Sequence, residues 1–152
     1  MSMIGTTLIK DICFREAGKA PSEILKVLDT ELGNTLNQNL EDGTKPPDGM
    51  DIIVCEIDLK TNYMRYAAAM RPLVVYKDGE QIYLKGSHSS VGGVYDREGK
   101  SFQDEGLQLT QGDIIYMFSD GYPDQFGGTM GKKFKMVRLK NMLVDIYQKP
   151  MD

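Results

Sequence analysis

The stretch DIIVCEIDLKTNYMRYAAAMRPLVVYKDGEQIYL, residues 51–84, decides the fold class of this chain. Its apolar runs at 51–59, 64–69 and 73–77 are short and rich in β-branched and aromatic residues, which is typical of strands. Asp78-Gly79 separates VVYK from EQIYL, and such a pair between apolar runs is a strong hairpin signal. Leu59–Asn62 has the composition of another turn between strands. The stretch therefore predicts antiparallel strands joined by short turns.

The residues before this stretch predict two helices. Gly18–Pro21 interrupts the apolar pattern, and Pro21 suits the first turn of a second helix. Residues 41–49 hold two glycines and two prolines besides polar side chains, so they are interpreted as a connector. The apolar positions that recur at three- and four-residue steps are Ile4, Leu8, Ile12, Ile24, Leu28, Leu32, Leu36 and Leu40.

The residues after residue 84 predict a loop, a strand and a helix. Gly86–Gly106 is polar and contains glycines, so it is expected to form a long surface loop. Asp113–Ser119, DIIYMFS, is almost entirely apolar and predicts a strand covered on both faces. Gly127–Gly131 predicts a loop, and helical spacing returns over Phe134–Tyr147. Helices and mostly antiparallel strands in this order predict an α+β fold with helices layered on sheets.

Length and composition favour one globular domain. The chain has 152 residues, of which 41% are hydrophobic and 26% charged, so we expect a single domain over 1–152. The net charge of −4 argues against broad nucleic-acid binding. The sequence shows no secretory signal and no apolar run of about 18 residues, so no membrane contact by this segment is expected. Two distant cysteines fit a reducing, cytoplasmic location.

Several catalytic chemistries lack their residues. His88 is the one histidine, and no G-x-S-x-G motif accompanies it. Neither a zinc-protease motif nor a glycine-rich nucleotide-binding motif occurs. Cys13 and Cys55 lack an arginine six positions later, where a cysteine phosphatase needs one, and are interpreted as small apolar residues.

Carboxylate chemistry remains, and the segment Phe118–Gly128 carries it. Asp120 directly follows an apolar strand and precedes a glycine, and Asp124 comes four residues later. Hard divalent cations prefer oxygen ligands of this kind. The spacing alone favours a plain Asp-Gly turn with solvated carboxylates, because such turns are common.

Three blocks of the sequence resemble the metal-dependent PPM-type protein serine/threonine phosphatases, the protein phosphatase 2C-like superfamily, in its bacterial SpoIIE-like branch. The first block, Gly49–Glu80, resembles the central strand pair and hairpin of that family. The second, Gly86–Gly93, resembles the loop before its Ile/Val-Gly pair. The third, YMFSDGYPDQFGGTMGKKF at Tyr116–Phe134, is closely similar to its S-D-G block.

This resemblance implies a fold, a reaction and a metal site. The fold is part of an α-β-β-α sandwich. In the family, aspartates hold two Mn²⁺ or Mg²⁺ ions, and a shared water or hydroxide attacks the phosphorus of phosphoserine or phosphothreonine. Asp120 matches the S-D-G metal ligand. Asp124 matches a position that helps to hold a further metal in some relatives.

Two departures from the family pattern predict an incomplete site. The D-G-x-G-H-G motif, whose aspartate bridges both metals, is absent, and Met1–Ile12 resembles the helix that follows it. A final D-D pair is also absent, and Asp152 matches no such motif. The chain is therefore expected to be a fragment without the N-terminal and C-terminal metal-ligand strands, inactive in isolation. The alternative is a non-catalytic phosphatase-like module that binds a partner.

Further expectations concern partners. The resemblance implies a phosphorylated regulatory protein as substrate in bacterial signalling, and a sensor module in the parent chain. Strands left without their neighbours predict a homodimer or larger assembly. A basic run at the last helix fits either attraction of an acidic partner or a solvated face. Its members are Lys132, Lys133, Lys135, Arg138 and Lys140. The glycines at 127, 128 and 131 fit an anion-binding nest or a plain loop.

Overall fold

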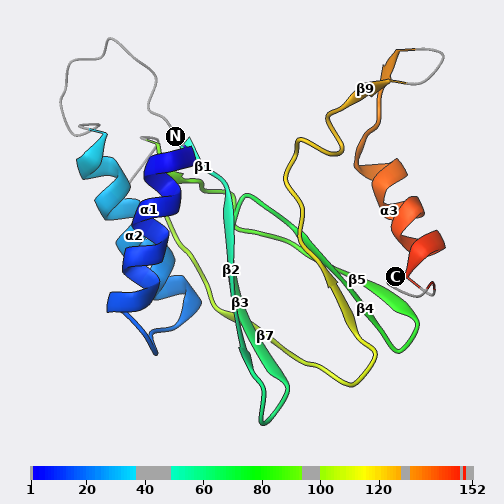
Figure 1. Cartoon of the computed structure of the whole chain (residues 1–152), viewed down its shortest axis with the longest axis horizontal. Coiled ribbons are helices and arrows are strands. Elements are labelled where there is room, and N and C mark those ends of the chain that lie inside the picture. The colour runs from blue at the N-terminus through cyan, green and yellow to red at the C-terminus, as the bar shows by residue number, and fades with distance from the viewer. Residues whose placement is uncertain (1, 37–48, 94–99, 128–130, 148, 150–152) are drawn as a thin grey trace. The chain divides into compact units, whose positions relative to one another are not determined.

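The computed structural model describes residues 2–36, 49–93, 100–127, 131–147 and 149. The chain divides into two compact units. Figure 1 draws the whole chain with a colour that follows the residue number. Unit 1 comprises Met1–Pro72 and Lys85–Leu109, and unit 2 comprises Leu73–Leu84 and Thr110–Asp152. Unit 1 combines two helices with antiparallel sheet and unit 2 combines one described helix with antiparallel sheet, so the predicted α+β class is confirmed. None of the described helices has the length and apolar character needed to cross a membrane.

Two helices open unit 1 and confirm the predicted pair. α1 (Ser2–Arg15) and α2 (Pro21–Thr35) are separated by the predicted break. Pro21 begins α2, where its missing N–H costs no hydrogen bond. The Glu23 carboxylate accepts a hydrogen bond of 3.0 Å from the backbone N–H of Ala20 and so caps the helix start. Residues 37–48, with Leu40 and most of the expected connector, lie outside the described residues.

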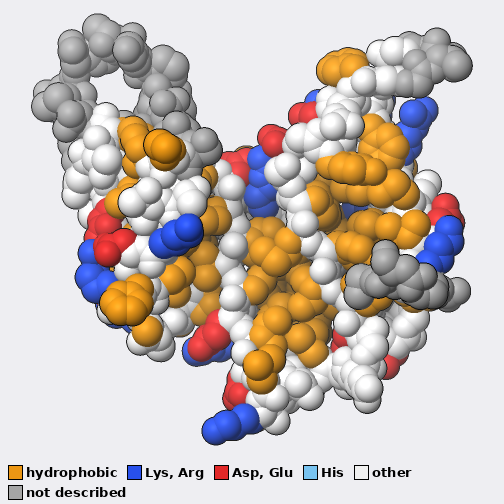
Figure 2. Space-filling view, viewed as in Figure 1, with side chains coloured by type: hydrophobic (Ala, Val, Ile, Leu, Met, Phe, Trp, Pro, Cys, Tyr) orange, Lys and Arg blue, Asp and Glu red, His pale blue; other side chains and the backbone are white. Residues whose placement is uncertain are grey.

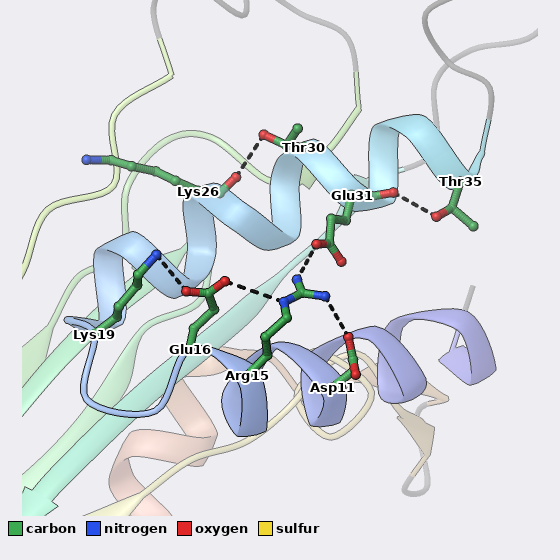
Figure 3. A network of polar contacts seen from close by, with 8 residues as sticks. All are labelled: Asp11, Arg15, Glu16, Lys19, Lys26, Thr30, Glu31 and Thr35. Carbon is green, nitrogen blue, oxygen red and sulfur yellow. Dashed lines mark hydrogen bonds and ion pairs between the residues drawn. The ribbon is translucent and has the colours of Figure 1, made fainter.

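An ion-pair network joins the two helices (Figure 3). Arg15 of α1 contacts Glu31 of α2 and lies 2.9 Å from Asp11. Glu16 lies 2.6 Å from the Lys19 ammonium, whose hydrogen bond holds the pKa of that carboxyl below its ordinary value. Because these side chains are partly exposed, the network orients the helices more than it stabilises them.

The sheet of unit 1 has three antiparallel strands. β2 (Ile52–Asp58) and β3 (Tyr63–Ala69) form the predicted pair, with Asn62 at a positive φ of 54° in the turn. β7 (Glu105–Gln108) pairs with the other edge of β3. A two-residue pair, β1 (Gly49–Met50) with β6 (Val91–Gly92), lies in the same unit.

The core of unit 1 lies between α2 and one face of β3. Ala67 and Ala69 alternate with Tyr66 and Ala68 along the strand, and small side chains on the face toward α2 let the helix approach closely. The fully or nearly fully buried residues of this cluster are Ile12, Leu25, Leu28, Leu32, Ala67, Ala69, Val91 and Phe102.

A buried lysine ties α2 to the segment around β6. The Lys100 side chain is 8% exposed, and its ammonium lies 2.8 Å from Asp29 of α2. The same ammonium donates hydrogen bonds to the carbonyl oxygens of Gly92 and, at 2.8 Å, Gly93. The Gly92 N–H donates to Asp29 at 2.7 Å, so the carboxylate and both glycines share one set of contacts.

Unit 2 is built on a three-stranded sheet with the order β5-β4-β8. The hairpin of β4 (Leu73–Lys77) and β5 (Glu80–Leu84) has the predicted bounds. Asp78 and Gly79 turn it with φ angles of 52° and 84°, the left-handed pair that a two-residue hairpin requires. β8 (Ile114–Tyr116) pairs antiparallel with the other side of β4.

A short hairpin and a helix complete unit 2. β9 (Phe126–Gly127) pairs with β10 (Lys132–Lys133), and α3 (Met136–Ile146) follows. α3 packs on the sheet through Leu139 and Leu143 against Val74 and Tyr76. Tyr147, after the helix, stacks on Tyr76 with ring centroids 4.3 Å apart.

Two predictions about strands were wrong in part. The expected surface loop Gly86–Gly106 contains β6 and the start of β7, and Phe102 within it is 4% exposed. The strand expected over Asp113–Ser119 is shorter, at Ile114–Tyr116, and its residues are half-buried rather than covered on both faces. The predicted organisation as a single domain stays a prediction.

A turn held by Asp113 precedes β8. The carboxylate accepts hydrogen bonds from the backbone N–H of Thr110 at 2.8 Å and from its hydroxyl at 3.0 Å. The Lys77 ammonium of β4 lies 3.4 Å away. Burial alone would raise the pKa of Asp113, but the bonds from Thr110 and the charge of Lys77 outweigh it and lower that pKa.

The core leucines of α2 give a stability prediction. Leu28 is 0% exposed, so Leu28→Ala is expected to lower the free energy of unfolding by about 2–5 kcal/mol. Leu59 is 85% exposed, so Leu59→Ala is the matched control and should change it by no more than about 0.5 kcal/mol. Urea unfolding followed by circular dichroism measures both. Equal effects would contradict the described core.

The Asp113 turn gives a pH prediction. Asp113→Asn should lower the free energy of unfolding at pH 7 by about 1–2 kcal/mol, because the charged hydrogen bonds weaken. The folded-state pKa lies below the ordinary value of 3.8, so this stabilisation is fully present above that value. It is lost as the pH falls through the folded-state pKa. Unfolding curves from about pH 6 down to about pH 2 should converge for the two proteins. A constant difference over that range would refute this account.

Candidate functional site

The segment Met117–Gln125 places the two candidate aspartates in one turn. The chain leaves β8 at Tyr116, and Asp120 begins the turn four residues later. The backbone N–H of Asp124 donates to the Asp120 carbonyl oxygen at 2.8 Å, so the two residues lie one helical turn apart. Both residues are exposed. The structure thus places Asp120 and Asp124 in one local turn, and their role as metal ligands stays a prediction.

The turn is fastened to the residues that follow it. The backbone N–H of Phe134 donates to the Gln125 carbonyl at 2.8 Å, and that of Lys135 donates to the Pro123 carbonyl at 2.7 Å. The ring of Phe134 meets the Tyr122 ring edge to face, with centroids 5.5 Å apart. These contacts make the turn, the β9–β10 hairpin and the start of α3 a single local assembly.

Asp124 forms an ion pair within this assembly. Its carboxylate lies 2.9 Å from the Lys133 ammonium of β10, and the two side chains are 50% and 42% exposed. A cation bound at Asp124 would have to compete with this lysine for the same oxygen atoms. The sequence pattern did not indicate this ion pair, because Lys133 lies near Asp124 only once β10 has folded back on β9.

The described residues do not by themselves fit a binuclear metal site. Among them, no group of three or more histidine, cysteine, aspartate or glutamate side chains is arranged to hold a metal ion. Mg²⁺ is octahedral and takes one or two carboxylates together with waters and substrate oxygens. Two bridged ions need more carboxylates than Asp120 and Asp124 supply. Asp152 lies outside the described residues.

The other candidate residues are placed as follows. His88 is exposed in the segment after β5, and both Cys13 and Cys55 are free thiols. Burial raises the pKa of the Cys55 thiol to about 11, which keeps it protonated and unreactive at neutral pH. Cys13 is exposed on α1, so the expectation that it packs as an apolar residue was wrong.

The glycine nest is tested only in part. Gly127 belongs to β9 and pairs with Lys132 of β10, so it is a strand residue and not part of the predicted loop. Gly128 lies outside the described residues. Gly131 has a φ of 56°, a left-handed conformation in which glycine is unstrained.

A polar cavity in unit 1 was missed by the sequence patterns. It has a volume of about 400 Å³, and its lining includes His88 and three serines together with Tyr66 and Glu105. Tyr66 of β3 donates a hydrogen bond to Glu105 of β7, its directly opposed partner in the sheet. Burial and the Glu105 charge both raise the pKa of Tyr66, so the phenol stays protonated. No periodicity signals this pair, because it depends on the register between two distant strands.

Comparisons with solved structures identify the fold. The SiaA-PP2C domain of Pseudomonas aeruginosa matches with a TM-score of 0.75 at 24% identity, over 98% of this chain and 54% of that one. The phosphatase domain of the cell fate determinant SpoIIE from Bacillus subtilis, presoaked with Mn, matches with a TM-score of 0.51 at 17% identity, over 97% and 58% of the two chains. The chain thus spans little more than half the length of these structures.

The comparison of sequences identifies the family. No curated protein sequence matches the chain. The family model described as Stage II sporulation protein E (SpoIIE) matches residues 2–152. That match includes the α1–α2 pair, both sheets and the turn that carries Asp120. The chain therefore belongs to the SpoIIE family.

Proposed function

We propose that this chain forms part of a metal-dependent protein serine/threonine phosphatase domain, which hydrolyses phosphoserine or phosphothreonine on a regulatory protein in bacterial signalling. The family match over residues 2–152 carries this proposal. The S-D-G turn after β8 supports it, because this turn is the part of the chain that most resembles the phosphatase metal site.

Asp120 is the proposed metal ligand, and Asp124 is proposed to help hold a further ion. Mn²⁺ or Mg²⁺ is the proposed cofactor, since both accept carboxylate oxygens. Binding at Asp124 requires that this carboxylate leave Lys133, from which it lies 2.9 Å away. The proposal also requires carboxylates beyond those in the described part of the chain.

The 152 residues alone are proposed to be inactive. The chain covers 54% and 58% of the two phosphatase-domain structures, so the activity of a whole domain is a proposal for this segment. The cytoplasmic location, a sensor module in the parent chain and the phosphorylated regulatory partner belong to the same proposal and rest on the family resemblance.

A non-catalytic interaction module is the second candidate. The ion pair of Asp124 with Lys133 favours it, because a carboxylate neutralised by a lysine is a poor metal ligand. Such a module would bind a phosphorylated partner through the same turn and hairpin without hydrolysing it.

Activity measurements separate the two candidates. The 152-residue chain is expected to release little or no phosphate from a phosphoserine peptide in the presence of Mn²⁺. A version extended at both ends with its flanking segments is expected to release phosphate at a rate that depends on Mn²⁺. Asp120→Asn in the extended protein should lower that rate by at least about 100-fold, since a metal ligand is lost.

A matched control is available on the same chain. Asp58 is an exposed aspartate in unit 1, distant in sequence from the turn, and Asp58→Asn should leave the rate unchanged. Robust turnover by the 152-residue chain that Asp120→Asn abolishes would show that the described carboxylates suffice. An extended protein that binds the peptide without turnover would favour the interaction module.

Self-association is also proposed. β2 and β8 are edge strands in the described sheets, and Ile57 in β2 is 42% exposed. A free edge presents unpaired N–H and C=O groups to a second chain. The interface is proposed to include residues 52–57 or 114–118, most simply as a two-fold dimer.

Sedimentation equilibrium at micromolar concentration tests this proposal. The expected mass lies above the 17.1 kDa of one chain. If β2 is the interface, Ile57→Lys should weaken association. Leu59→Lys, in the exposed turn beside it, is the matched control and should not. A clean 17.1 kDa monomer would refute the idea.

A further inference from the structure

The basic residues before and within α3 differ in their contacts. Some of their charged groups contact another side chain and others do not. Lys133 pairs with Asp124, and the Lys140 ammonium lies 3.4 Å from the centroid of the Tyr83 ring. The side chains of Lys132 and Arg138 form no ion pair or hydrogen bond with any residue in the described part of the chain. The sequence pattern could not separate these two pairs of cations.

Lys132 and Arg138 line one cavity with three aromatic rings. The cavity has a volume of about 320 Å³ and lies wholly in unit 2. The rings come from the turn, β9 and the segment before α3, and the full lining is Tyr122, Gln125, Phe126, Gly127, Lys132, Phe134 and Arg138. Figure 2 shows hydrophobic side chains gathered over β9 and α3, with lysine and arginine side chains beside them.

This lining selects a side chain with an apolar stem and an anionic end. Phe126 is 75% exposed, so its ring offers unpartnered apolar surface to a ligand. A guanidinium binds a carboxylate through two parallel hydrogen bonds, and an ammonium adds a second positive charge. A cavity of this size is near the lower limit for ligand pockets and suits one or two residues of a peptide.

The cavity adjoins the proposed catalytic turn. Tyr122 lies two residues after Asp120, so their Cα atoms are no more than about 7.6 Å apart. An extended peptide advances about 3.3 Å per residue. A residue held in the cavity would therefore lie a few positions from a phosphorylated residue at Asp120.

We propose that this cavity binds a glutamate or aspartate of the phosphoprotein substrate, two to four positions from the phosphorylated residue. The proposal rests on the proposed phosphatase function and names the sequence class of its substrate. The chain as a whole carries a net charge of −4, so a preference for an acidic peptide requires a local basic surface such as this one.

Peptide binding to the 152-residue chain tests the proposal without metal or turnover. One fluorescein-labelled phosphoserine peptide carries glutamates two to four positions from the phosphoserine, and the second carries glutamines there. Fluorescence anisotropy should show about fivefold tighter binding of the glutamate peptide at low salt. About 0.5 M NaCl should reduce that preference.

Variants at exposed positions locate the preference. Arg138→Gln and Lys132→Gln should each lower it, and the double variant should abolish it. Phe126→Ala should weaken binding of both peptides. The matched controls are Lys26→Gln, at an exposed cation, and Phe14→Ala, at an 88% exposed ring, both in unit 1. Neither variant should change the affinity for either peptide.

Each outcome bears on the proposal in a distinct way. A glutamate preference that survives in the double variant, or its absence in the wild-type chain, overturns it. If Arg138→Gln and Lys132→Gln weaken binding of both phosphopeptides equally, the cavity holds the phosphate itself, which also overturns the proposal. An inactive extended protein with an intact preference would refute the phosphatase but leave the cavity as a peptide site.

Discussion

The pairing of β4 with strands on both sides is the constraint on which unit 2 depends. β5 holds one edge of β4 through the Asp78-Gly79 turn, and β8 holds the other through Val74 to Tyr76. Because side chains alternate along β4, a slip of one residue would move Val74 and Tyr76 away from α3. The register therefore fixes where β8 ends and where the turn with Asp120 begins.

The sequence predicted the elements whose contacts are local. The β4–β5 hairpin was placed to the residue because its turn residues adopt left-handed conformations that few others tolerate. The sequence patterns missed β6 and β7, since these strands pair with Met50 and Tyr66, which are distant in the chain, and each is short and holds one apolar residue, Val91 or Leu107. β8 is shorter than its apolar run because pairing with β4 stops at Tyr116.

The candidate site divides in the same way. A contiguous motif marks Asp120 and Asp124, so sequence alone was enough to select them. The ion pair of Asp124 with Lys133 and the grouping of Tyr122, Phe126 and Arg138 arise from the fold of the β9–β10 hairpin. No spacing in the sequence predicts this ion pair or this grouping of side chains. Charges that form one run in the sequence thus have different environments in the structure.

The Lys100 contacts have a consequence for motion. Its ammonium holds Asp29 of α2 and two glycine carbonyls together, and the Gly92 N–H is bonded to the same carboxylate. Separating α2 from β6 would leave a buried charge without its counter-ion, so local opening there is costly. The Gly92 amide should therefore exchange its hydrogen with solvent only when α2 detaches, although it belongs to a strand of two residues. Amide exchange at this single glycine would report the docking of the whole helix.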